Sequence, residues 1–166
     1  MNLEKSKKIK EIKDELSEKY KLAIKDLSIT AISEDNINID VLATNLIDLP
    51  YKSYVKQLQQ IDLLRTNQLI LNEKKIVEDD MLGTINKDTE LKNQAQRDAK
   101  QRQLLQTNDF YNDVEECVLI SQQLKLLLSA QINYYDNLLS GIKYRYKQMC
   151  NLLLADQKLQ DVVNNE

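Results

Sequence analysis

The sequence predicts an all-α protein built on a long antiparallel helical hairpin with small accessory helices, and three observations support this. The 166 residues include only two glycines and one proline, whereas β-sandwiches and βαβ folds need frequent turn residues. The stretch 110–163 contains one glycine, Gly141, and no proline. Its apolar residues recur at helical spacing throughout, which favours one long helix.

The apolar residues of 110–163 form a coiled-coil-like seam with steps of three and four residues, interrupted by one local stutter at Leu124, Leu128 and Ile132. The seam comprises Val114, Cys117, Ser121, Leu124, Leu128, Ile132, Tyr135, Leu139, Ile142, Tyr146, Met149 and Leu153. Off the seam lie Leu119, Ile120, Leu126, Leu127, Tyr134, Leu138, Leu152 and Leu154. A helix with two apolar faces is expected to be buried on two sides. We therefore expect homo-oligomerisation, assigned to Leu124, Leu128, Tyr135, Leu139, Ile142 and Tyr146.

The N-terminal part, residues 1–28, is predicted to be a separate amphipathic helix, with 29–166 forming the hairpin and oligomerisation domain. Its apolar face comprises Ile9, Ile12, Leu16, Tyr20, Ala23 and Leu27. The lysine-rich start, Lys5 to Lys8, is interpreted as a solvated helix face, with phosphate contact as the alternative.

Residues 33–36 have the composition of a turn or a helix start, and a helix is predicted over about 40–48. Leu49 precedes Pro50 and so disfavours the α conformation, which predicts a boundary there, with Pro50 as first residue of the next helix. That helix is expected to end at Gly83. One face of it comprises Tyr54, Leu58, Ile61, Arg65, Gln68, Leu71, Lys75 and Glu78. Residues 84–109 are polar and predict a loop followed by a short, weakly anchored helix.

Composition limits the function classes. The chain carries 23 Lys and Arg against 26 Asp and Glu, which argues against binding a polyanion through net charge alone. Basic residues concentrate locally, however, in 1–28 and 87–103, so any nucleic-acid contact has to be local. No apolar run reaches the roughly 20 residues that span a bilayer, so we expect a soluble protein without a membrane partner. Cys117 and Cys150 are expected to be reduced, buried thiols in a cytoplasmic setting.

Catalysis is not expected. The chain contains no histidine, which excludes Ser-His-Asp and Cys-His arrangements and histidine-based zinc sites. Two glycines cannot build a phosphate-binding loop. Neighbouring carboxylates in Glu78-Asp79-Asp80 and Glu115-Glu116 diverge around a helix, so they are interpreted as solvated faces, without metal or cofactor.

The stretch 143–147 interleaves bases with aromatics, in the order Lys143, Tyr144, Arg145, Tyr146, Lys147. This residue pairing occurs where proteins stack and neutralise single strands. Tyr146 lies on the seam, so a core tyrosine with flanking ion pairs is an equally good interpretation.

Over roughly residues 39–160 the chain resembles the UvsY family, the recombination mediators of large tailed phages. The resemblance rests on Leu49-Pro50-Tyr51-Lys52-Ser53-Tyr54-Val55 opening a long helix, Asn72-Glu73-Lys74-Lys75-Ile76 near its end, a polar middle, and Tyr134-Tyr135-Asp136 through Lys147 on a final long helix. It implies a non-enzymatic protein that closes into a homo-oligomeric ring, binds single-stranded DNA and loads a phage recombinase onto strands coated with a single-strand binding protein. The implied location is the cytoplasm of the infected bacterial cell.

The DNA-binding residues that this resemblance and the local charge suggest are basic. They are Lys74, Lys75, Lys92, Arg97, Lys100, Arg102, Lys143, Arg145 and Lys147. The family carries a basic stretch after the position of Lys75, whereas this chain has Glu78, Asp79 and Asp80, which repel phosphate. The other basic segments would have to compensate, or many weak sites would act together in a ring.

Two other functions remain open. A structural scaffold or adaptor, such as a virion or assembly protein, would oligomerise without binding DNA. An acidic helical inhibitor of a host defence complex would mimic nucleic acid through one patch of Glu73, Glu78, Asp79 and Asp80.

Overall fold

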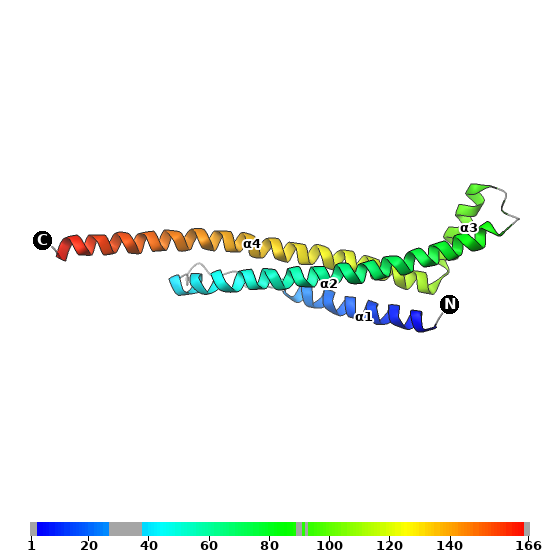
Figure 1. Ribbon diagram of the computed structural model, residues 1–166, viewed down its shortest axis with the longest axis horizontal. Helices are drawn as coiled ribbons and strands as arrows, with labels where there is room; N and C mark the ends of the chain where they lie inside the picture. Colours follow the sequence, from blue (N-terminus) through cyan, green and yellow to red (C-terminus); the bar gives the residue numbers. More distant parts are fainter. Residues whose placement is uncertain (1–2, 27–37, 89–90, 92, 165–166) are drawn as a thin grey trace. The chain divides into compact units, whose positions relative to one another are not determined.

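The computed structural model describes residues 3–26, 38–88, 91 and 93–164. It contains α1 (Leu3–Asp26), α2 (Ile39–Asn86), α3 (Gln94–Gln106) and α4 (Asp109–Asn164), and none of the described residues forms a strand (Figure 1). The all-α prediction, with a long helix pair packed together, is confirmed. None of the helices in the described ranges combines the length and apolar character needed to cross a membrane.

Asparagine side chains cap the N-termini of three of the helices. Asn38 Oδ1 accepts a hydrogen bond from the backbone N–H of Val41 at 2.8 Å. Asn93 Oδ1 accepts a hydrogen bond from the backbone N–H of Gln96 at 2.9 Å, and Asn108 Oδ1 accepts one from the backbone N–H of Tyr111 at 3.0 Å. Each bond satisfies one of the N–H groups that a helix start leaves without an intrahelical partner, so the boundaries of α2, α3 and α4 have a local cause in the sequence.

The chain forms two compact units. Unit 1 contains α1, residues 60–86 of α2, α3, and residues 109–127 of α4. Unit 2 contains residues 39–59 of α2 and 128–164 of α4. The structure thus groups α1 with parts of α2 and α4, while the separate domains expected at 1–28 and 29–166 stay a prediction.

Unit 1 has a core drawn from three helices. The amphipathic pattern predicted for the N-terminal helix is confirmed, because Ile9, Leu16 and Ala23 are buried at successive steps of seven residues. The other buried apolar side chains of this unit are Leu63, Ile70 and Ile85 of α2 and Phe110, Val114, Cys117 and Leu124 of α4. Burial of this kind, at about 25 cal/mol per Å² of apolar surface, is the main term that holds the three helices together.

Unit 2 is an antiparallel helix pair with its own apolar cluster. Leu42 and Leu49 of α2 pack with Tyr135 and Ile142 of α4. Leu46, Leu138, Leu139, Tyr146 and Met149 pack against this cluster and are partly buried. At its edge, the buried Ser53 hydroxyl donates a hydrogen bond to Asp136 Oδ1 at 3.0 Å. The pairing of α2 with α4 predicted from the apolar pattern is therefore present here.

The predicted helix boundary at Pro50 is wrong, because α2 continues through this residue. Proline removes one backbone hydrogen bond and crowds the preceding turn, at a cost of about 3 kcal/mol in a helix interior. Leu42, Leu46 and Leu49 before the proline and Ser53 after it all face α4. A break would interrupt this packing, so tertiary contacts outweigh the local preference.

The predicted end at Gly83 is also wrong. The helix runs on to Asn86, and Gly83 has no positive φ. Ile85, which is 1% exposed, lies in this last turn. Its burial accounts for the additional helical residues, since glycine costs a helix only about 1 kcal/mol relative to alanine.

The apolar face predicted for the second long helix is the solvent side of α2. Tyr54, Leu58 and Ile61 are all about half exposed. The buried positions are instead Leu42, Leu49, Lys56, Leu63 and Ile70, at steps of seven residues. The prediction of a polar loop followed by a short helix is confirmed by α3, in which no residue is buried. The turn or helix start predicted at 33–36 lies outside the described residues.

Candidate nucleic-acid interface

Lys74 lies inside an ion-pair network of unit 1. Its Nζ atom is 2.5 Å from Glu115 Oε1 on α4 and 3.9 Å from Glu78 Oε1, one turn further along α2. The same Nζ lies 5.9 Å from the centroid of the Tyr111 ring. The Tyr111 hydroxyl in turn donates to Glu78 Oε1 at 2.9 Å. Lys74 therefore joins α2 to α4, and its charge is neutralised within the chain.

Tyr111 is held in the neutral form by this network. Burial raises the pKa of Tyr111 well above its usual value of 10.0, and its hydrogen bond to Glu78 acts in the same direction. The hydroxyl thus stays a donor, which keeps the Glu78 carboxylate bound between Tyr111 and Lys74.

Lysines of α1 make a second set of ion pairs in unit 1. Lys13 Nζ lies 2.6 Å from Glu116 Oε2 and 3.0 Å from Asp113 Oδ1. Hydrogen bonds to Glu116 and then to Asp113 raise the pKa of Lys13. Two further lysines, Lys5 and Lys19, pair with Glu73 and Asp62 of α2, each at 3.1 Å. Four acids thus serve as anchors for α1.

The other suggested DNA-binding residues differ in their surroundings. Lys75 is exposed on α2. Arg97 is partly buried, and its Nε donates to the backbone oxygen of Leu91 at 3.4 Å. Lys100 and Arg102 are exposed on α3. Lys92 lies outside the described residues. Lys75 and the two exposed cations of α3 thus remain candidates in unit 1.

The segment 143–147 presents its charges to solvent. Lys143, Arg145 and Lys147 are exposed, and Tyr144 is 65% exposed. Tyr146 packs against the unit 2 cluster. At 100° per residue, Lys143, Tyr144 and Lys147 share one side of α4 and Arg145 lies on another. The structure therefore brings two cations and one aromatic together and assigns Tyr146 to the interior.

The six residues proposed for oligomerisation lie toward the interior of the chain. Leu124, Leu128, Tyr135 and Ile142 are buried, and Leu139 and Tyr146 pack against the unit 2 cluster. An oligomer that used them would have to expose side chains that the cores of units 1 and 2 cover. Their role in self-association stays a prediction. The apolar residues of α4 that reach the surface are Leu119, Leu126, Tyr134, Tyr144, Leu152, Leu153 and Leu154.

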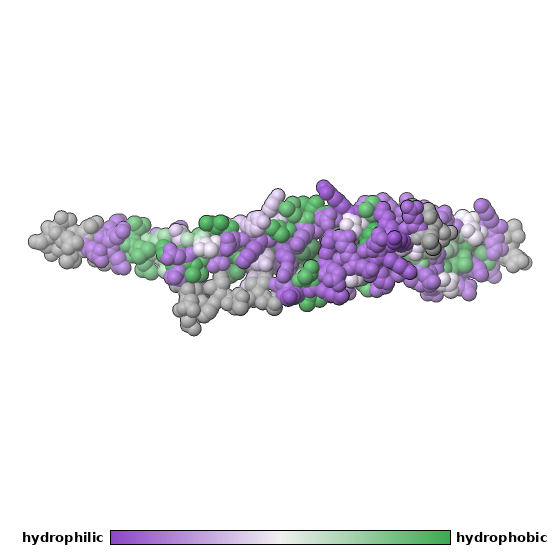
Figure 2. All heavy atoms as spheres, turned by 90° about the horizontal axis from the view of Figure 1, so that it is seen from below, coloured by the Kyte–Doolittle hydropathy of each residue, from purple (hydrophilic) through white to green (hydrophobic). Residues whose placement is uncertain are grey.

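Sequence reasoning placed Tyr54 and Leu58 on one helix face but missed that Ile47 and Tyr51 extend this face as an exposed apolar surface of α2. Ile47 is 75% exposed and Tyr51 is 69% exposed, and Tyr54 and Leu58 follow on the same side of the helix. The sequence signal for this surface is that α2 carries two sets of apolar residues, each repeating every seven residues, so that one set can face α4 while the other faces outward. Figure 2 shows one face of the molecule, on which hydrophobic side chains occur in separate groups between hydrophilic ones.

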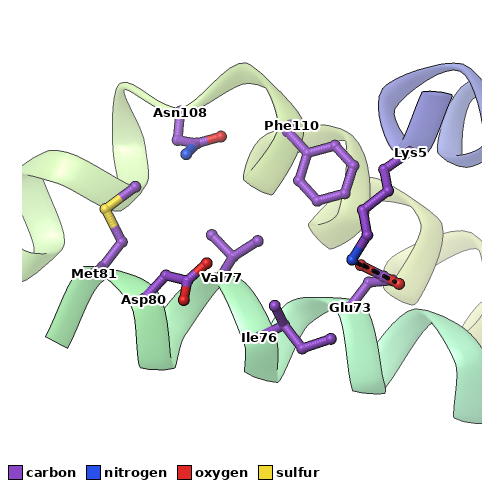
Figure 3. Close-up of a pocket in the computed structure, with 8 residues that line it drawn as sticks. All are labelled: Lys5, Glu73, Ile76, Val77, Asp80, Met81, Asn108 and Phe110. Atoms are coloured by element: carbon purple, nitrogen blue, oxygen red, sulfur yellow. Dashed lines mark hydrogen bonds and ion pairs between the residues drawn. The ribbon is translucent and has the colours of Figure 1, made fainter. Parts of the chain in front are cut away.

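Unit 1 also contains an open pocket of about 340 Å³ (Figure 3). Ile76, Val77 and Met81 of α2 and the buried Phe110 of α4 supply its apolar lining. The remaining lining residues are Lys5, Glu73, Asp80 and Asn108. The ion pair between Lys5 and Glu73 closes one side of the pocket, as the dashed lines in Figure 3 show. Of the polar lining groups, Lys5 pairs with Glu73, and Asn108 Oδ1 accepts the hydrogen bond from the backbone N–H of Tyr111.

The carboxylates of α2 do not form a metal site. Glu78 is bound to Tyr111 and Lys74, while Asp79 and Asp80 are exposed. Within the described ranges, no group of three or more His, Cys, Asp or Glu side chains is arranged to hold a metal ion. The acidic patch suggested for a nucleic-acid mimic is likewise divided, because Glu73 pairs with Lys5 and Glu78 faces α4.

The two cysteines differ in environment. Cys117 is fully buried in unit 1, where its Sγ lies 3.8 Å from the backbone oxygen of Ile9. Burial raises the pKa of the Cys117 thiol to about 11. Cys150 is only partly buried. Both are free thiols, and the neutral Cys117 acts as a small apolar core residue.

The chain matches no protein-family model, no curated protein and no solved structure.

Proposed function

We propose that the protein is a non-enzymatic, self-associating mediator that binds single-stranded DNA through the 143–147 segment of α4 and promotes recombinase loading onto strands coated with a single-strand binding protein. The observation that carries the DNA-binding part is the exposure of Lys143, Tyr144 and Lys147 on one side of α4. Lysines one turn apart can contact successive phosphates while the tyrosine ring stacks on a base, a combination that tolerates any sequence.

The recombinase-loading part rests on the resemblance to the phage mediators described above. Self-association is supported by the large apolar side chains that α2 and α4 expose. In this proposal Lys74 is a structural residue, because its charge is paired with Glu115. The DNA contact therefore lies on α4, and the exposed Lys100 and Arg102 of α3 supply a second contact.

The test is anisotropy of a fluorescent oligo-dT titrated with the full chain at several salt concentrations. Binding should weaken as salt rises, with a slope near −0.7 per phosphate neutralised on a single strand. The double variant Lys143→Gln, Lys147→Gln should bind about tenfold more weakly and lower this slope by about 1.4. Tyr144→Ala should weaken binding with the slope unchanged, since stacking releases no counterions.

The matched controls are Lys10→Gln and Lys125→Gln, which remove exposed lysines of unit 1. These variants should bind like the wild-type chain. Equal losses in all the lysine variants would point to net charge rather than to the 143–147 segment. Recombinase filament growth on coated strands, with and without the chain, then tests the mediator role itself.

A second candidate is a structural scaffold or adaptor that does not bind DNA. It is favoured by the extent of exposed apolar surface, including Ile47 at 75% and Leu126 at 71%. An oligomer that ignores oligo-dT even at low salt would support this candidate and contradict the mediator proposal.

A further inference from the structure

The outward side of α2 in unit 2 carries a regular line of large apolar residues. Ile47, Tyr51, Tyr54 and Leu58 are 75%, 69%, 55% and 47% exposed. They follow one another at steps of four, three and four residues, which is the spacing of a coiled-coil seam. We call these four residues the α2 outer stripe.

The α2 outer stripe lies on the opposite side of the helix from α4. Leu42, Leu49 and Ser53 define the side that contacts α4. At 100° per residue, the centre of the stripe is rotated by roughly 150° from that side. α4 of the same chain therefore cannot cover it, and α2 has two opposite faces with heptad spacing.

The corresponding part of α2 in unit 1 shows what a second apolar face is used for. There α2 contacts α4 through Lys74 and also contacts α1, through the ion pairs Lys19–Asp62 and Lys5–Glu73. Ile9 and Ile12 of α1 line a pocket together with Leu69 of α2. Two helices thus share α2 in unit 1, whereas among the described residues of unit 2 only α4 packs on it.

We propose that the α2 outer stripe is a self-association surface on which the same stripe of a second copy packs antiparallel. This inference rests on the self-association part of the proposed function and gives it an interface. With Tyr51 of one copy opposite Tyr54 of the other, Ile47 lies opposite Leu58, so all four residues of each copy meet an apolar partner. The phenol hydroxyl groups would reach the wet rim of the interface, as tyrosines at interfaces commonly do.

The charges beside the stripe are compatible with this pairing. Asp48, Pro50, Val55 and Gln57 flank it, Lys52 follows Tyr51, and Asp62 lies one turn after Leu58. An antiparallel arrangement places the acidic ends of the two helices, with Asp40 and Asp48, at opposite ends of the interface. The Asp40 and Asp48 carboxylates of one copy are therefore kept apart from those of the other.

The exposed area sets the expected strength. A tyrosine buries about 150–250 Å² when fully covered, so the observed exposures correspond to about 450 Å² per copy for the four residues. This is roughly half of the 800 Å² per partner that is typical of a stable interface. We therefore expect an association that depends on protein concentration.

The end of α4 is a less suitable occupant of the stripe. Leu152, Leu153 and Leu154 are all exposed, but successive residues on a helix point about 100° apart. They cannot form one continuous line opposite the stripe. The four residues of the stripe are spaced so that they can pair with the same stripe of another chain, which favours a second copy of α2 as the occupant.

The test uses two full-length variants of opposite charge, one with Tyr51→Lys and Tyr54→Lys, the other with Tyr51→Glu and Tyr54→Glu. Their masses, separately and mixed, are measured by sedimentation over a range of concentrations. Each variant alone should associate at least tenfold more weakly than the wild-type chain. The equimolar mixture should recover association, because lysine then faces glutamate across the interface. Circular dichroism should show unchanged helix content, since both positions are solvent-exposed.

The control is Leu22→Glu, which alters an apolar residue that is 59% exposed on α1 of unit 1 and should leave the mass unchanged. Variants that associate like the wild-type chain would overturn the proposal. So would a mixture that stays as dissociated as its components, because the stripe would then contact something other than itself. Oligo-dT binding is measured on the same samples: its absence in an associating wild-type chain would contradict the DNA-binding part of the function and leave this interface intact.

Discussion

The ammonium group of Lys74 on α2 lies 5.9 Å from the centroid of the Tyr111 ring on α4. Glu115 and Glu78 bind the same ammonium group from two sides. A lysine that the family resemblance suggests for DNA contact is thereby engaged in holding two helices of unit 1 together. Its side chain is 27% exposed, so the contact is only partly screened by solvent.

Replacing Lys74 is expected to change stability more than DNA binding. Lys74→Ala should lower the free energy of unfolding by about 1 kcal/mol, because it removes a partly buried ion pair and a cation–π contact. Its affinity for oligo-dT should stay within twofold of wild type. Urea unfolding and anisotropy measure the two quantities, and Lys75→Ala, which removes the exposed neighbour, is the control for stability. A large loss of DNA affinity in a stable Lys74→Ala chain would contradict the structural role.

The two faces of α2 predict different costs for the same substitution. Ile70 is 0% exposed and Ile61 is 49% exposed. Ile70→Ala should destabilise the chain by about 2–5 kcal/mol, through lost burial and the cavity left behind. Ile61→Ala should cost less than about 1 kcal/mol. Urea unfolding of the pair checks the assignment, and comparable losses would mean that the Ile61 side of α2 is also covered in solution.

The elements could be predicted from the sequence because their signals are local. The seven-residue spacing of Ile9, Leu16 and Ala23 and the long stretch 110–163 both give helices where expected. The failures at Pro50 and Gly83 have one cause. Local preferences of about 1–3 kcal/mol were outweighed by burial of Leu49 and Ile85, which depends on residues distant in sequence.

The candidate site was less predictable than the fold. Two apolar sets alternate along α2, and the sequence pattern alone does not say which of them faces α4. The role of Lys74 depends on Glu115, forty-one positions away in the sequence, a pairing set by the helix register. By contrast, Lys143 and Lys147 could be placed on one flank from their spacing alone, because they lie one turn apart on the same helix.

Alkaline pH should destabilise the chain through Cys117. Its pKa is raised by burial from 9.0 to about 11 in the folded chain. Below pH 9 the thiol is neutral in both states. Between pH 9 and 11 the unfolded chain loses this proton while the folded chain keeps it, so the free energy of unfolding falls by an amount on the order of 2 kcal/mol. Tyr111, whose pKa is also raised, acts in the same direction above pH 10.

The measurement is urea unfolding across pH 8 to 11 for the wild-type chain and for Cys117→Ala. The variant should lose the part of the slope that begins near pH 9 and keep the part due to Tyr111. Thiol titration gives an independent check, because the partly buried Cys150 should react before Cys117 does. An identical pH dependence in both chains would mean that Cys117 does not stay neutral in the folded state.

Replacing Pro50 with alanine should stabilise the chain. The helix is continuous through it, although proline lacks the N–H that would bond to the carbonyl oxygen of Leu46. Pro50→Ala restores that donor and removes the ring, so we expect the free energy of unfolding to rise by about 1–3 kcal/mol. Gly83→Ala is the control within the same helix: a β-carbon there meets no atom within 4 Å, so about 1 kcal/mol is expected. If Pro50→Ala lowers stability while Gly83→Ala raises it, α2 is bent or interrupted at Pro50 in solution, and the packing of Leu49 and Ser53 on α4 depends on that bend.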